Sequence, residues 1–179
     1  STIKPISVSA ALESKSIMPH SIIDTTARYY KVGRHIVRDT HDHGKISVAE
    51  VIQKSSNIGA IIIGDKVKSK YLWNTLNNFG LGKKTKVSFP GEVTGTLKHY
   101  KNWRKTDHES ATFGYGMSTT LIQLAHSYTV FANEGKIKKV SLLKTEGPSI
   151  GRRVISIKTS NQMLKMLESV VKDGTAEHA

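Results

Sequence analysis

The sequence predicts one folded unit of the α+β class in which helices dominate and strands are few and short. Its 179 residues are enough to bury a hydrophobic core. Hydrophobic residues make up 37% and charged residues 23%, with only 4 Pro, which is typical of globular rather than disordered chains. Several segments carry apolar residues at helical spacing, whereas the β-prone segments are short.

The sequence of the first half of the chain predicts four helices and one irregular segment. Apolar residues follow Lys4 as far as about Ser14, and a Ser47-x-x-Glu50 capping box precedes a further apolar run. The polar stretch 18–44 predicts an irregular segment with a small hairpin near Ile36-Val37. The expected helices cover about residues 4–14, 47–54, 58–67 and 70–78.

The second half predicts loops, one strong helix, two short strands and a final helix. Glycines and Pro90 interrupt residues 80–107, so that section should be loops with at most one short strand pair. Thr120 and Gln123 form a capping box before an apolar helix that should end near Gly135. Strands are expected at 140–143 and 154–157. Ser160 should cap a last helix that ends at Gly174, with a core face of Met163, Leu164, Leu167, Val170 and Val171.

Composition excludes several kinds of site and leaves the partner open. The formal net charge of +13 favours an anionic partner, which could be nucleic acid, anionic lipid or anionic cell wall. With no cysteine, the chain can form neither a disulfide nor a thiolate zinc site. The longest apolar run, 58–64, is too short to span a bilayer, and the N-terminal residues show no targeting segment. We expect the chain to be cut from something longer.

Ser1 and Lys4 are candidates for nucleophilic catalysis. Residues at i and i+3 are neighbours on the first turn of a helix. A serine hydroxyl needs a nearby base, and a lysine can serve when burial or the positive end of a helix lowers its pKa. Pro5 cannot donate a hydrogen bond to the Ser1 carbonyl, so Ser1 should lie at the mouth of the helix. A lone S-x-x-K pattern also occurs in ordinary surface turns.

A second element, Ser55-Ser56-Asn57, falls at a predicted junction between two helices. There a hydroxyl and an amide could point into a cleft, although an ordinary helix cap would explain the same residues. The surrounding sequence, 46–59, is far more specific. With Ser1-Thr2-Ile3-Lys4-Pro5, it resembles the transpeptidase domain of class B penicillin-binding proteins, especially the cell-division, penicillin-binding-protein-3 type.

The resemblance extends along most of the chain in the family's order and approximate spacing. Its further segments are Phe79-Gly80-Leu81-Gly82, Phe89-Pro90-Gly91-Glu92 with Gly95, Ala111-Thr112, Gly114-Tyr115-Gly116 and Gln123-Leu124-Ala125. Two departures matter. Leu121 stands where the family usually has proline, and the family's Lys-Thr/Ser-Gly strand is absent from the sequence. The resemblance therefore implies a partial transpeptidase domain over 1–179, from the nucleophile to just before that strand.

The resemblance implies a penicillin-binding-protein and serine β-lactamase-like fold and a serine-type D,D-transpeptidase activity that cross-links peptidoglycan. Ser1 would be the nucleophile, Lys4 the base and Ser55 a proton relay. The resemblance implies Asn57, Tyr115 and Gly116 as substrate-binding residues. Asn57 would bind the substrate amide and Lys4, whereas Tyr115, beside Gly116, would line the cleft or only shape a tight turn. One oxyanion donor would come from the missing strand, so this exact chain should be weakly active or inactive. No cofactor and no metal are implied.

The implied partners are a stem peptide ending in D-Ala-D-Ala, β-lactam antibiotics and division-machinery membrane proteins. The parent protein would act at the periplasmic face of the bacterial inner membrane, anchored by a segment outside this chain. Nucleic acid is not an expected partner.

Two other functions remain as alternatives. The positive charge would suit a basic nucleic-acid-binding domain, although basic residues are spread along the chain without a recognition motif. An N-terminal-nucleophile hydrolase would also begin with Ser1, but those folds are β-rich.

The stretch 38–43 holds Asp and His at alternate positions, as a metal site could. An ordinary polar loop is the better interpretation of these residues.

Overall fold

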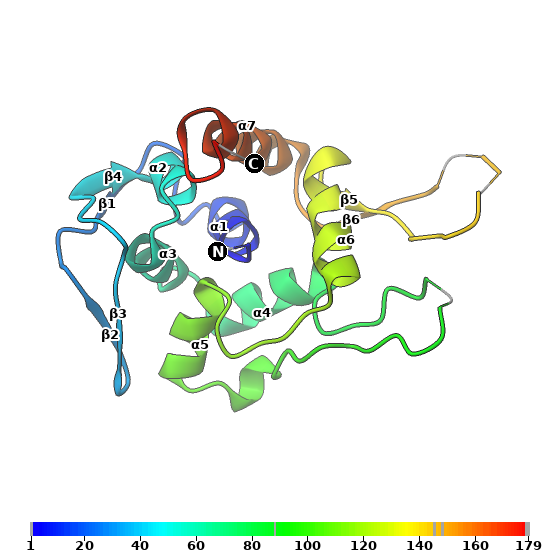
Figure 1. The fold of residues 1–179 in the computed structure, drawn as a ribbon, viewed down its shortest axis with the longest axis horizontal. Coiled ribbons are helices and arrows are strands. Elements are labelled where there is room, and N and C mark those ends of the chain that lie inside the picture. Colours follow the sequence, from blue (N-terminus) through cyan, green and yellow to red (C-terminus); the bar gives the residue numbers. More distant parts are fainter. Residues whose placement is uncertain (1, 88, 145, 148, 178–179) are drawn as a thin grey trace.

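The protein is described by a computed structural model that covers residues 2–87, 89–144, 146–147 and 149–177 (Figure 1). Helices and short strands are both present, so the α+β class is confirmed. The helices are α1 (Lys4–Glu13), α2 (Val48–Gln53), α3 (Asn57–Gly64), α4 (Ser69–Asn78), η1 (Tyr100–Asn102, a 3₁₀ turn), α5 (Lys105–Thr112), α6 (Leu121–Ala132) and α7 (Ile157–Asp173). None of the helices in the described ranges is long and apolar enough to cross a membrane.

The first helix, α1, lies at the centre of the helical cluster. Every residue from 4 to 12 is buried, and Figure 1 shows the helix surrounded by α2, α3, α4 and α7. A helix that is enclosed on all sides needs no polar face, which explains why this segment lacks a clear apolar stripe. The central position of α1 places its first turn, with Lys4, inside the fold rather than on the surface.

Polar caps set the helix boundaries where the sequence predicts them. Ser47 and Glu50 form the expected capping box before α2, and Thr120 and Gln123 form the one before α6. The buried amide of Gln123 also donates to the carbonyl oxygens of Lys83 at 2.6 Å and Thr94 at 2.7 Å. Gln123 therefore links the loop that contains Lys83 and Thr94 to the start of α6.

The described strands form three antiparallel pairs. β1 (Ile22–Asp24) pairs with β4 (Lys45–Ser47), and β5 (Lys136–Ile137) pairs with β6 (Arg152–Arg153). β2 (Tyr30–Val32) and β3 (His35–Val37) form a hairpin, with Tyr30 opposite Val37. The hairpin expected near Ile36-Val37 is thus confirmed.

The section 80–107 departs from the expected loops. It holds η1 and the start of α5, and in place of a strand pair the described backbone has an isolated bridge from Thr96 to Ser118. The sequence analysis missed α5 because its buried face includes the polar residues His108, Glu109 and Thr112, which do not form an apolar stripe. Their polar atoms are satisfied within the fold, as by the bond from His108 Nε2 to the Gly64 carbonyl oxygen at 3.0 Å.

The strands expected at 140–143 and 154–157 are also wrong. Leu142 and Leu143 are exposed, and the described strands are β5 and β6 instead. An apolar segment forms a strand when a neighbouring surface buries its side chains. The side chains of these two leucines remain exposed instead. The cap of α7 is Ser156 rather than Ser160, because Glu13 accepts hydrogen bonds from the Ser156 backbone N–H at 2.9 Å and hydroxyl at 2.5 Å.

The core face of α7 is narrower than the sequence suggests. Met163 and Met166 are buried, whereas Leu164 and Val171 are 41% and 54% exposed. The expected end of this helix at Gly174 is confirmed.

Candidate active site

Lys4 and Ser55 meet although 51 positions separate them in the sequence. Lys4, in the first turn of α1, is 2% exposed, and its Nζ donates to Ser55 Oγ at 3.0 Å. The same Nζ also donates to the Ser55 carbonyl oxygen. The structure therefore brings two of the three predicted catalytic side chains into contact. Ser1, the predicted nucleophile, lies outside the described residues.

Ser55 has an uncommon backbone conformation. It lies between the end of α2 and the start of α3, with φ +56°, in the left-handed region that residues other than glycine rarely occupy. Its backbone N–H donates to the Ile52 carbonyl oxygen at 3.1 Å. Such conformations persist where surrounding contacts hold them, and they concentrate at functional sites. Here the conformation holds the hydroxyl of Ser55 against the Lys4 amine.

Asp39 fixes the start of α3 beside this pair. Its carboxylate accepts hydrogen bonds from Ser56 Oγ at 2.5 Å and from the backbone N–H groups of Asn57 and Ile58 at 2.5 Å and 3.2 Å. A carboxylate at a helix N-terminus satisfies unpaired N–H groups and complements the helix dipole. The sequence analysis placed Asp39 in a polar loop, because a cap supplied from so far along the chain has no local signal. Among the described residues, no group of three metal-ligating side chains is present.

Burial changes the acid–base behaviour of Lys4. Removal of the ammonium group from water lowers the pKa of Lys4 to about 8, and the negative charge of Asp39 partly opposes this shift. A lysine with a pKa near neutrality has a sizeable neutral fraction and can accept a proton from a hydroxyl group.

The predicted substrate-binding residues line neighbouring hollows. Asn57 and Tyr115 line one of about 330 Å³, and the Asn57 amide donates to the Arg38 carbonyl oxygen at 3.0 Å. Lys4 and Ser55 line a separate hollow of about 420 Å³. Asn57 was expected to bind Lys4, but the described bonds of the lysine go to Ser55.

Tyr115 both lines a hollow and forms part of a tight turn. It is 73% exposed and lies between Gly114 at φ +90° and Gly116 at φ +75°. A Cβ on Gly114 would lie 2.9 Å from the Ile3 side chain, so the turn packs directly on the residue before Lys4. The absence of a side chain at Gly114 therefore allows the turn that carries Tyr115 to pack against Ile3.

Tyr128 is a further residue at the site that the sequence analysis treated only as part of a helix. Its hydroxyl, on α6, donates to the Thr2 carbonyl oxygen at 2.8 Å. Burial raises the pKa of Tyr128 to about 12, which keeps this donor protonated. Tyr128 thus attaches the residue next to Ser1 to α6.

A buried lysine of lowered pKa bonded to a serine hydroxyl can pass protons to and from a reacting group. The sequence profile of the family described as "Penicillin binding protein transpeptidase domain" matches residues 1–179. The chain belongs to this family, and the resemblance in its motifs is confirmed.

Individual relatives agree with the family. The "Probable peptidoglycan D,D-transpeptidase PenA" of Neisseria flavescens is 32% identical over 97% of this chain and 43% of its own length. The "Peptidoglycan D,D-transpeptidase FtsI" of Escherichia coli K12 is 30% identical over 97% of this chain and 29% of its own length. The chain thus spans less than half the length of these two curated relatives.

The fold also matches a solved transpeptidase domain. The apo structure of the TP domain from Burkholderia pseudomallei penicillin-binding protein 3 aligns with a TM-score of 0.94 and 38% identity. The alignment covers 98% of this chain and 54% of the solved one. The expected penicillin-binding-protein fold is confirmed, and these comparisons do not support the nucleic-acid or N-terminal-nucleophile alternatives.

Proposed function

We propose that residues 1–179 are part of the transpeptidase domain of a peptidoglycan D,D-transpeptidase that cross-links stem peptides during cell division. The observation that carries this proposal is the bond between buried Lys4 and Ser55, in a chain that matches the transpeptidase family throughout. The two relatives described as D,D-transpeptidases support the same activity.

The reaction would proceed by two acyl transfers. Neutral Lys4 takes the proton of Ser1 as Ser1 Oγ attacks the carbonyl carbon of the penultimate D-alanine. The C–N bond breaks, and the departing terminal D-alanine receives that proton through Lys4 and Ser55. An amine of a second stem peptide then attacks the ester, loses its proton to the same groups and releases Ser1 with a new peptide bond. A β-lactam would acylate Ser1 in the first step.

The surrounding residues would position the donor peptide. Asn57 would bind an amide of the stem peptide, while Tyr115 and Gly116 would border the cleft; the hollow that Asn57 shares with Tyr115 supports this role. The Lys-Thr/Ser-Gly strand of the family would lie in another part of the whole protein, because no such sequence occurs in the 179 residues. The isolated chain would then be weakly active or inactive.

The whole protein would act at the periplasmic face of the inner membrane through an anchor outside this chain, together with membrane proteins of the division machinery. The role in division rests on the resemblance of the motifs to the cell-division type of class B penicillin-binding protein, and the match to penicillin-binding protein 3 of Burkholderia pseudomallei agrees with that type.

The test measures D-alanine release from a stem pentapeptide by the full-length protein. We expect Ser1→Ala and Lys4→Met to reduce kcat/KM by at least about 10³-fold, because nucleophile and base act as a unit. Ser14→Ala and Lys165→Met, at exposed positions, serve as matched controls and should leave the rate unchanged. Undiminished release by Ser1→Ala would exclude the proposed mechanism.

A further inference from the structure

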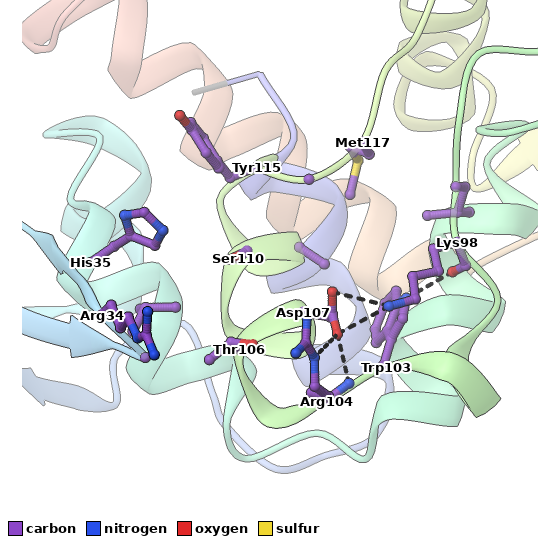
Figure 2. Close-up of a pocket in the computed structure, with 15 residues that line it drawn as sticks. Arg34, His35, Lys98, Trp103, Arg104, Thr106, Asp107, Ser110, Tyr115 and Met117 are labelled. Atoms are coloured by element: carbon purple, nitrogen blue, oxygen red, sulfur yellow. Dashed lines mark hydrogen bonds and ion pairs between the residues drawn. The ribbon is translucent and has the colours of Figure 1, made fainter.

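A larger hollow of about 490 Å³ lies between the β2–β3 hairpin, α5 and the loop that carries Lys98 (Figure 2). We call it the Trp103 groove; the residues that matter here are Arg34, His35, Lys98, Trp103, Arg104 and Tyr115. Figure 2 shows Arg34 and His35 on the hairpin side and Lys98 and Trp103 on the opposite side. The proposed transpeptidase mechanism assigns no role to this groove apart from its border at Tyr115 and Gly116.

The walls of the groove are held by specific contacts. Gly33, at the hairpin turn, has φ +59°, and a Cβ there would lie 2.8 Å from Thr106 Cγ2. The hairpin turn therefore packs closely on α5. On the other wall, the indole N–H of Trp103 donates to the Lys98 carbonyl oxygen at 2.7 Å. These contacts fix the positions of both walls of the groove within the fold.

The lining of the groove carries excess positive charge. Lys98 and Arg104 share a single carboxylate, that of Asp107, at 3.3 Å and 3.7 Å. The Arg104 backbone N–H, together with Lys98, holds the pKa of Asp107 below its usual range, so the carboxylate stays charged. Arg34 forms no ion pair with any of the described residues. Three cations thus face one anion, and Arg34 is free to bind a further carboxylate.

The groove continues into the hollow that contains Asn57. The two hollows share four lining residues: Val32, His35, Ser110 and Tyr115. A peptide bound beside Asn57 can therefore extend past Tyr115 without leaving a concave surface.

From this continuity and charge we infer that the Trp103 groove binds a carboxylate-bearing segment of the peptide substrate, remote from the bond that is cleaved. Arg34 and Arg104 present planar guanidinium groups that match a carboxylate, and the Trp103 and Tyr115 rings offer apolar surface to the adjoining peptide. This inference rests on the proposed function, and it assigns substrate selection to residues that take no part in acyl transfer.

The test compares two substrates with the full-length protein. One is a stem pentapeptide with free internal carboxylates, and the other is the same peptide with those internal carboxylates amidated and its C-terminal carboxylate left free. In Arg34→Gln/Lys98→Gln/Arg104→Gln we expect kcat/KM for the carboxylate peptide to fall about 5- to 30-fold, mainly through KM. The amidated peptide and the rate of β-lactam acylation should change less than about 2-fold.

Matched controls separate local charge from net charge and from folding. Lys139→Gln/Lys158→Gln/Lys165→Gln removes three exposed cations outside the groove and should leave both substrates unaffected. Arg34→Gln alone breaks no described ion pair, so it should fold normally and still reduce kcat/KM for the carboxylate peptide about 2- to 5-fold.

An equal effect on both peptides, or none in either groove variant, would overturn the inference. Normal β-lactam acylation in those same proteins would show that only the groove assignment had failed. Absence of acylation in the wild type would instead reject the proposed function, on which the inference rests.

Discussion

The buried amine of Lys4 predicts a characteristic pH dependence of acylation. Burial lowers the pKa of Lys4 from 10.5 to about 8. At pH 7 the neutral fraction is then about 10%, against about 0.03% for a lysine at the ordinary value. The fold therefore provides about 300-fold more neutral base at pH 7 than an exposed lysine would.

The assay measures second-order acylation of the full-length protein by a β-lactam between pH 6 and 10. The neutral amine is the reactive form, so the rate should rise about tenfold per pH unit below the pKa and reach a plateau above about pH 8. Asp39 raises the pKa of Lys4, so Asp39→Asn should move the inflection to lower pH while its amide oxygen continues to cap α3.

Two results would refute this reasoning. A rate that does not change between pH 6 and 9 would show that Lys4 does not act as the titrating base. An inflection that stays in place or moves upward in Asp39→Asn would show that the charge of Asp39 does not reach the amine.

Two further predictions concern stability. Lys4→Met should stabilise the protein by about 1–3 kcal/mol at pH 7, measured by urea unfolding, because folding lowers the pKa of Lys4 and burial penalises the protonated amine. That advantage should shrink as pH rises from about 8 to 10.5, since the folded wild type loses its proton first; a constant difference would contradict the assignment. Gly64→Ala should destabilise by about 1–3 kcal/mol, because the new Cβ would lie 2.1 Å from Thr112 Cγ2. Thr112→Ser removes that methyl group and should recover part of the loss in the double variant; strict additivity would contradict the clash.

Local signals predicted most of the helices, with α5 as the exception. The Ser47–Glu50 and Thr120–Gln123 capping boxes lie within four residues and include their own partners, so they predict helix starts without knowledge of the fold. The start of α7 shows the limit. Ser156 and Ser160 are both plausible caps, and only the approach of Glu13 from α1 selects Ser156.

Local motifs likewise predicted some residues of the candidate site, and distant contacts supply the others. Lys4 and Ser55 could be proposed from short motifs, although their contact depends on the left-handed conformation of Ser55. Asp39 and Tyr128 could not be proposed, because each acts through a bond to a residue far along the chain. A single sequence contains no signal for such pairs.

The most direct test of the central claim is the intact mass of the full-length protein after exposure to a β-lactam, with the adduct mapped by peptide sequencing. The account predicts one adduct per chain, located on Ser1 and absent in Ser1→Ala. A folded protein with an unmodified Ser1, or with the adduct on another residue, would contradict it.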